Sequence, residues 1–157
     1  MGAESFDVQL ESPLTLEGLS AILVGQGLRL NFDPSRHVDE LHYVYEDDSH
    51  LIEFELSRVR RGTRLAARFA LCQSQTIDEA FVKLVTTIAK AGGARLAIKS
   101  EVSDRDGETF ASTRLEGAAS AILRAAGEKR AAWIRDFTVR DTKASCEEAV
   151  RRFLLTR

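Results

Sequence analysis

Residues 41–71, LHYVYEDDSHLIEFELSRVRRGTRLAARFAL, are the stretch that decides the fold. Apolar side chains occupy alternate positions in three successive runs, and this alternation predicts β-strands with one buried face. A tight turn centred on residues 48–49 and a second turn at 60–62 would bring the apolar residues of neighbouring strands together on that face. The expected cross-strand pairs are Tyr45 with Ile52, Tyr43 with Phe54, Leu41 with Leu56, Leu56 with Leu65, Phe54 with Ala67 and Ile52 with Phe69. The stretch therefore predicts a three-stranded antiparallel meander.

A strongly amphipathic helix is predicted directly after the meander. Thr76 and Glu79 have the spacing of a capping box, apolar residues then recur at helical intervals as far as residue 89, and two glycines follow at 92–93. We expect this helix to cover the apolar face of the meander. On the N-terminal side of the meander, the alternation over residues 5–11 predicts a further strand.

A shorter helix is expected between that first strand and the meander. Ser12-Pro13 offers its start, because proline is tolerated in the first turn of a helix. The leucines and isoleucine at positions 16, 19, 22 and 23 share one helical face. Gly25 and Gly27 are expected to end the helix, since glycine adopts the left-handed cap conformation easily. A brief strand is then predicted at 28–32.

The last third of the chain leaves two boundaries open. Alternation at 96–98 indicates a strand. Residues 108–113 fit either a return strand or direct entry into a helix, and the strand is favoured. The helix that starts at Leu115 either stops at Gly127 or continues beyond it. Ser145 and Glu148 have the spacing of a further capping box, which predicts a short terminal helix at 146–155.

These signals together predict an α+β fold in a single domain spanning residues 1–157. The expected element order is β-α-β-βββ-α-β(β)-α-α, with an antiparallel sheet and helices packed on one of its faces. A chain of 157 residues suits one domain, and no segment rich in Pro, Gly and Ser divides it.

Composition narrows the class of protein. The formal net charge of -2 argues against a strongly basic nucleic-acid binder. No apolar run approaches the roughly 20 residues of a membrane span, and the first twelve residues lack the features of a signal peptide. Two cysteines, Cys72 and Cys146, are too few for a disulfide scaffold and fit a reducing compartment. Cys146 is the candidate reactive thiol because it begins a predicted helix, although packing as a small apolar residue is favoured. We expect a cytoplasmic protein.

No motif for a metal, a cofactor or catalysis stands out. The three histidines, His37, His42 and His50, lack metal-ligand spacing, and the expected register makes His42 a solvated cross-strand partner of Glu55. The segment SDRDGE at 103–108 hints at a calcium loop but lacks the remaining carboxylates, so a hairpin turn is favoured. Phosphate-binding glycine loops and nucleophile elbows do not occur. We predict no catalytic residue, no cofactor and no metal.

Charge is segregated along the meander. Residues 37–57 contain acidic residues but no Lys or Arg, whereas residues 58–68 contain no acid. The second segment carries five arginines, which we call the arginine cluster: Arg58, Arg60, Arg61, Arg64 and Arg68. The two turns of the meander should lie roughly 25 Å apart, beyond a Debye length of about 8 Å, so they would act as separate patches. Solvated hairpin ends with cross-strand pairs such as Glu53 with Arg68 are one interpretation, and a docking tip for an acidic partner is the other.

The order of elements resembles the bacterial YbjN family and the type III secretion chaperones over residues 14–137. The segments that carry the likeness are LEGLSAILVGQGLRLNF at 16–32, HLIEFEL at 50–56, RLAARFAL at 64–71 and TIDEAFVKLVTTIAKAGGARLAIKSEV at 76–102. The chain departs from both by a strand at 5–11 and a helix at 146–155, and its second helix lacks the asparagines of YbjN proteins. The resemblance implies a binding module, often dimeric, that holds a protein segment.

The leading hypothesis is a non-enzymatic protein-binding module, with a chaperone-like, regulatory or inhibitor role, whose arginine cluster steers an acidic partner. A homodimer fits this hypothesis. The alternative is a small-ligand sensor or an enzyme with a pocket between sheet and helices. Nucleic-acid binding by the arginine cluster is the weakest option, because no exposed aromatic residues are interleaved with the arginines.

Overall fold

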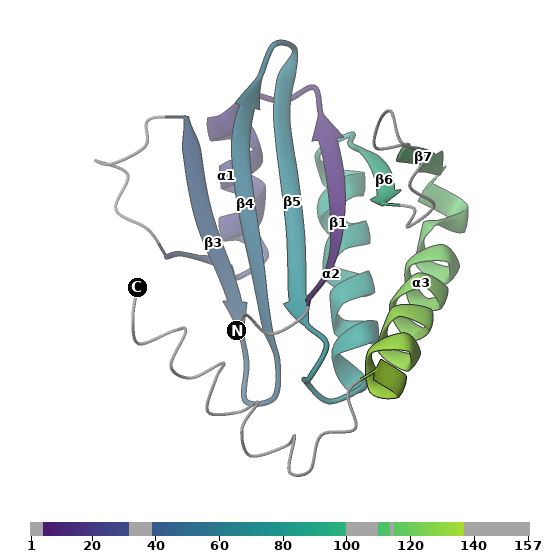
Figure 1. Ribbon diagram of the computed structural model, residues 1–157. Coiled ribbons are helices and arrows are strands. Elements are labelled where there is room, and N and C mark those ends of the chain that lie inside the picture. The colour runs from purple at the N-terminus through teal and green to yellow at the C-terminus, as the bar shows by residue number, and fades with distance from the viewer. Residues whose placement is uncertain (1–4, 32–38, 100–109, 114, 137–157) are drawn as a thin grey trace.

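The computed structural model describes residues 5–31, 39–99, 110–113 and 115–136, which form an α+β fold (Figure 1). The element order agrees with the prediction over this part of the chain, and the expected helix at 146–155 lies outside the described residues. The elements are β1 (Ser5–Ser12), α1 (Leu16–Gly25), β2 (Arg29–Leu30), β3 (Glu40–Glu46), β4 (Leu51–Val59), β5 (Gly62–Ala70), α2 (Thr76–Ala91), β6 (Arg95–Lys99), β7 (Phe110–Thr113) and α3 (Leu115–Asp136).

The described strands form one antiparallel sheet in the order β2-β3-β4-β5-β1-β6-β7. The meander β3-β4-β5 has the predicted register: Tyr43 pairs with Phe54, and Phe54 pairs with Ala67. The β4–β5 ladder begins at Glu53 and Arg68, one residue short of the expected pair of Ile52 with Phe69. The N-terminal strand β1 lies in the interior of the sheet, between β5 and β6.

All three helices lie on one face of the sheet, as predicted (Figure 1). Helix α1 contacts β4 and β5, α2 contacts β5, and α3 contacts β6 and α2. Three phenylalanine rings from β1, β5 and α2 form the centre of the apolar core: Phe69 lies 4.8 Å from Phe81 and 5.6 Å from Phe6 between ring centroids. The opposite face of the sheet is covered by none of the described helices, so we call it the open face.

The expected start of α1 is wrong by three residues. Thr15 is the N-cap, and its side-chain oxygen accepts a hydrogen bond from the main-chain N–H of Gly18. Ser12 ends β1 instead: its hydroxyl is buried and donates to the main-chain oxygen of Gly92 at 2.6 Å. Because this partner lies 80 residues away in the sequence, Ser12 remains part of the strand and the helix begins later.

The capping box at the start of α2 is also absent. Gln75 is the N-cap and has helical dihedral angles, with no hydrogen bond from its side chain to the helix. The main-chain oxygens of Ser74 and Gln75 accept from Ile77 and Asp78, so the first turn begins before Thr76. The Thr76 hydroxyl is therefore not needed as a cap, and it contacts His50 instead.

The structure decides both boundaries that the sequence left open. Residues Phe110–Thr113 form the edge strand β7, which pairs with β6. Helix α3 runs without a break through Gly127 to Asp136. None of the helices in the described part of the chain is long and apolar enough to cross a membrane.

Candidate functional site

The β4–β5 turn is the structural centre of the arginine cluster. Arg60 and Arg61 form the turn itself, between the paired residues Val59 and Gly62. Gly62 has φ +119°, and a Cβ there would lie 2.0 Å from the main-chain oxygen of Ser12. The end of the hairpin is thus packed tightly against the segment that joins β1 to α1, which holds the turn in one position.

Three members of the arginine cluster take part in ion pairs. Arg68 Nε lies 2.5 Å from Glu53 Oε2, which confirms the expected cross-strand pair. The other two pair with carboxylates far away in the sequence: Arg58 with Glu17 at 3.2 Å and Asp39 at 3.6 Å, and Arg64 with Glu11 at 3.2 Å. All three arginine side chains are close to half exposed, so each pair contributes at most about 1 kcal/mol to stability. Their charges are nevertheless locally compensated.

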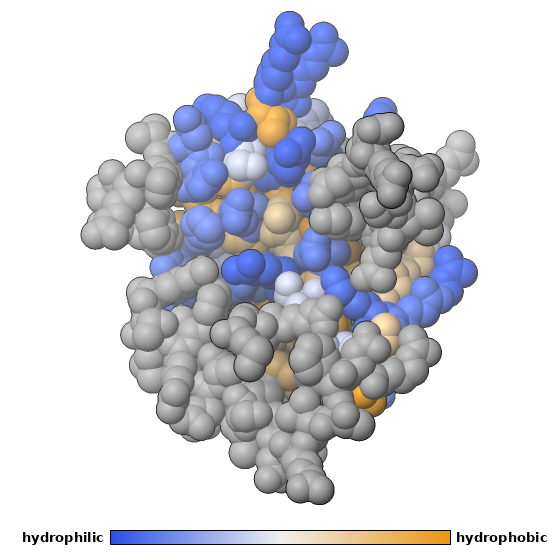
Figure 2. All heavy atoms as spheres, in the orientation of Figure 1, coloured by the Kyte–Doolittle hydropathy of each residue, from blue (hydrophilic) through white to orange (hydrophobic). Residues whose placement is uncertain are grey.

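Arg60 and Arg61 differ from the rest of the cluster. Both are exposed, and neither forms an ion pair with any residue in the described part of the chain. The turn that carries them is the end of the molecule at the top of Figure 1, and hydrophilic side chains project from the same end in Figure 2. Within the part of the chain that the structure describes, two guanidinium groups of the arginine cluster thus lack a counter-charge, and both lie at a projecting tip.

The β3–β4 turn, at the opposite end of the sheet, carries a polar network that the sequence did not indicate. His50 Nδ1 lies 3.0 Å from Asp47 Oδ2, and His50 Nε2 lies 2.9 Å from Thr76 Oγ1 at the start of α2. The hydrogen bonds from the His50 ring and from the main-chain N–H groups of Ser49 and His50 lower the pKa of Asp47 to about 2. Burial and the Asp47 charge raise the pKa of Tyr45, whose hydroxyl donates to Asp47 at 3.3 Å.

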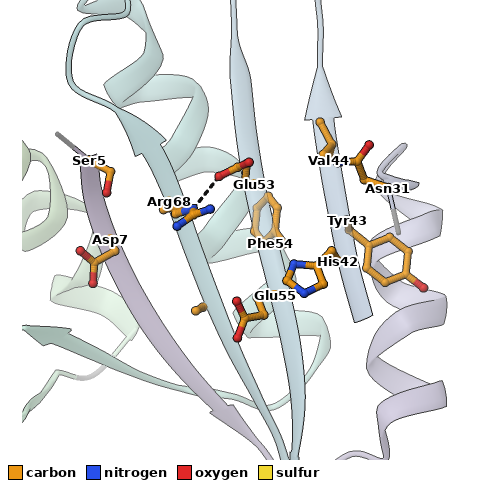
Figure 3. A pocket seen from close by; sticks show the side chains of 11 residues that line it. Ser5, Asp7, Asn31, His42, Tyr43, Val44, Glu53, Phe54, Glu55 and Arg68 are labelled. Carbon is orange, nitrogen blue, oxygen red and sulfur yellow. Dashed lines mark hydrogen bonds and ion pairs between the residues drawn. The ribbon is translucent and has the colours of Figure 1, made fainter. Parts of the chain in front are cut away.

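A shallow polar hollow of about 200 Å³ lies on the open face (Figure 3). Ala66 has the smallest side chain among the residues that line the hollow. Its lining residues come mainly from β1, β3, β4 and β5: Ser5, Asp7, Asn31, His42, Tyr43, Val44, Glu53, Phe54, Glu55, Ala66 and Arg68. Asp7 and Glu55 form no ion pair with the described residues, whereas Arg68 forms an ion pair with Glu53. The hollow can therefore accept a small polar or cationic group.

The hollow lies on the other side of the sheet from the pocket that the alternative hypothesis expected. Between the sheet and the helices, the described residues form an apolar core, whereas the hollow lies on the open face. His42 and Glu55 are cross-strand partners, as predicted. Within the described residues no three potential ligands are grouped to hold a metal ion. His37 and the possible calcium loop at 103–108 lie outside the described residues.

The expectation that both cysteines are reduced is wrong for Cys72. Cys72 follows β5 in the connection to α2, and it is disulfide-bonded. Cys146 lies outside the described residues. Two cysteines are too few for a disulfide scaffold, but a well-packed protein can hold a single disulfide bond without such a scaffold.

No protein-family model matches this chain, and no curated protein matches its sequence. The resemblance to YbjN proteins and type III secretion chaperones therefore stays a prediction.

Proposed function

We propose that this chain is a protein-binding module that engages an acidic segment of a partner protein through Arg60 and Arg61. The observation that carries the proposal is that these two side chains, at a projecting turn, form no ion pair with the described residues, whereas the three neighbouring arginines do. A guanidinium group presents a planar fork of N–H donors that matches a carboxylate, so two adjacent arginines suit an acidic segment well.

The rigidity of the turn favours binding. Strands β4 and β5 pair up to Val59 and Gly62, and Gly62 is packed against Ser12 and Pro13. The main chain that presents the two arginines is consequently ordered before a partner arrives, which lowers the entropic cost of association. The formal net charge of -2 gives no long-range attraction to the dense negative charge of nucleic acid, so a short acidic protein segment that contacts the two arginines locally is the favoured partner.

The likeness to YbjN proteins and type III secretion chaperones supports the same proposal, because it implies a module that holds a protein segment. A chaperone-like, regulatory or inhibitor role is compatible with it. A homodimer belongs to this proposal as well.

The test is affinity capture from the native host's lysate, with nuclease added, at low and at high salt. The Arg60→Glu/Arg61→Glu variant is compared with Lys83→Glu/Arg124→Glu, which makes the same change in charge at exposed positions of α2 and α3. We expect the wild type and the control to retain one stoichiometric protein partner at low salt, and the tip variant to lose it. Equal capture by both variants would exclude the tip as the binding site.

A small-ligand sensor or enzyme is the second candidate, and the hollow over Ala66 is the observation that favours it. The carboxylates of Asp7 and Glu55 could hold an ammonium or guanidinium group there. A ligand that binds only the folded state raises the melting temperature, so a screen of metabolites should reveal one. Replacing Ala66 with leucine would fill the hollow and should abolish the shift. A complete screen without any shift would argue against this function.

A further inference from the structure

We propose that Asp47, His50 and Thr76 form a hydroxyl-activating site, at which Thr76 Oγ1 attacks activated carboxylic esters. Asp47 and His50 belong to the β3–β4 turn, and Thr76 is the first residue of α2, so folding joins two segments that are distant in sequence. A nucleophile within hydrogen-bond reach of a base, with that base oriented by a third group, is the arrangement that activates hydroxyl groups for acyl transfer. The inference goes beyond the proposed binding role and does not depend on it.

The positions of the protons follow from the chemistry of the three groups. The ionised carboxylate of Asp47 can only accept hydrogen bonds, so His50 Nδ1, at 3.0 Å, must carry the hydrogen. In the neutral imidazole Nε2 is then the unprotonated nitrogen. Thr76 Oγ1 has one hydrogen and two acceptors within reach, His50 Nε2 at 2.9 Å and Ser74 Oγ at 3.2 Å; donation to Nε2 is the shorter of the two contacts. This direction of donation is the one that precedes transfer of the hydroxyl proton to His50.

Asp47 acts as a positioning residue for the imidazole. Its Oδ1 accepts from the main-chain N–H groups of Ser49 and His50, both at 2.8 Å, which leaves Oδ2 directed at the His50 ring. The same bonds hold the pKa of Asp47 at about 2, so the carboxylate is ionised at neutral pH. The ring is thereby fixed in one tautomer and one orientation without help from a bound ligand.

The exposure of the two reacting groups fits their roles. The His50 side chain is only 15% exposed, whereas Thr76 is exposed and open to a substrate. Thr76 is the first residue of a helix of 16 residues, whose dipole favours a developing negative charge, although the main-chain N–H groups of Ile77 and Asp78 already donate to Ser74 and Gln75. Thr76 is not part of the hollow on the open face, so we infer small activated esters as substrates rather than large ones.

In the acyl-transfer step, His50 acts first as the base and then as the acid. The Oγ1–H bond of Thr76 breaks as its proton moves to His50 Nε2, and Oγ1 forms a bond to the ester carbonyl carbon. The bond from that carbon to the leaving oxygen then breaks, and His50 returns the proton to the leaving group. The products are an alcohol or phenol and an acyl ester on Thr76. Water, deprotonated by the same imidazole, would release the acid and restore the site.

The experiment treats the full chain with p-nitrophenyl acetate and maps acetylated residues by peptide mass spectrometry. We expect rapid acetylation of Thr76 in the wild type. His50→Ala should lower its rate by roughly a hundredfold or more, because general bases contribute about that much. Free imidazole should restore part of that rate, a result that a purely structural role for His50 would not give. Thr76→Val should remove the acetylation, and circular dichroism is used to verify that each variant is folded.

Thr87 supplies the matched control, because it is an exposed threonine of the same helix whose hydroxyl donates to the main-chain oxygen of Lys83 at 2.7 Å. Its acetylation should be slow in the wild type and unchanged in His50→Ala. The proposal is overturned if Thr76 is acetylated no faster than Thr87, or at an equal rate without His50. Acetylation of Ser74, whose hydroxyl lies 3.2 Å from that of Thr76, in place of Thr76 would overturn it as well.

Discussion

Arg130 Nη2 lies 2.5 Å from Asp78 Oδ1 and thereby joins α3 to the first turn of α2, with the two side chains only 12% and 8% exposed. Arg130 Nη1 also donates to the main-chain oxygens of Leu71, at 2.5 Å, and Gln73, at 2.9 Å. A single guanidinium group thus satisfies three acceptors in the β5–α2 region. Its buried Nε has no hydrogen-bond partner within the described residues. The guanidinium group is therefore held in one orientation, although not all of its donors are paired.

Replacement of Arg130 with methionine should destabilise the fold by about 3–5 kcal/mol, since it leaves Asp78 buried without a counter-charge. Urea unfolding followed by circular dichroism measures the loss. The control is Arg124→Met, on an exposed position of the same helix, which should change stability by no more than about 0.5 kcal/mol. Equal effects of the two variants would mean that the pair does not hold α3 in place.

Gly62→Ala should destabilise the protein by about 2 kcal/mol or more, because the added methyl group clashes with the main chain of Ser12 and the positive φ is strained. Gly127→Ala is the matched control. Gly127 lies within α3 with open space around it, so alanine there should stabilise by about 0.5–1 kcal/mol. Thermal and urea unfolding of both variants would reveal the opposite signs. A neutral Gly62→Ala would show that the hairpin end is loosely packed.

The stabilisation that Asp47 provides should disappear in acid. Its pKa is about 2 in the folded protein, against an ordinary value of 3.8. Because the folded-state pKa is depressed, the contribution is present above about pH 4 and is lost as the pH falls towards 2. We therefore expect Asp47→Asn to be less stable than the wild type at about pH 6 and nearly equal to it at about pH 2.

Urea unfolding at several pH values measures this difference. The matched control is Asp48→Asn in the same turn, an exposed position at which the substitution should change stability by no more than about 0.5 kcal/mol. A wild-type advantage over Asp47→Asn that stays constant with pH would contradict the role of the charge.

Charge reversal should separate the two kinds of arginine in the cluster. Arg60→Glu/Arg61→Glu changes exposed side chains without partners in the described part of the chain, so stability should stay within about 0.5 kcal/mol. Arg68→Glu places a second carboxylate beside Glu53 and should cost about 1 kcal/mol. Guanidinium unfolding is unsuitable because the denaturant screens charge, so urea at low salt is the measurement. A larger loss of stability in Arg60→Glu/Arg61→Glu than in Arg68→Glu would contradict the view that the tip arginines are unpaired with the described residues and that Arg68 is paired.

Local patterns in the sequence determined the meander and its register, the strand β1 and the position of α2. Each of these depends on apolar residues repeating every two or every 3.6 positions, which neighbours in the chain specify by themselves. The pairs of Tyr43 with Phe54, His42 with Glu55 and Glu53 with Arg68 follow from that register once the turn lengths are known. The location of the arginine tip was predictable for the same reason.

Which of those arginines lack an ion-pair partner within the described residues depends on the tertiary structure. The partners of Arg58 and Arg64 lie on α1, before β3 and on β1, because β1 inserts beside β5 and α1 packs over β4. The spacing of Thr76 and Glu79 predicted a helix cap, yet in the folded chain the Thr76 hydroxyl contacts His50, 26 residues earlier. Periodicity records which face of an element is buried, but it carries no information on which distant element supplies a polar partner. Those partners depend on the order of strands in the sheet, which the packing of the whole chain sets.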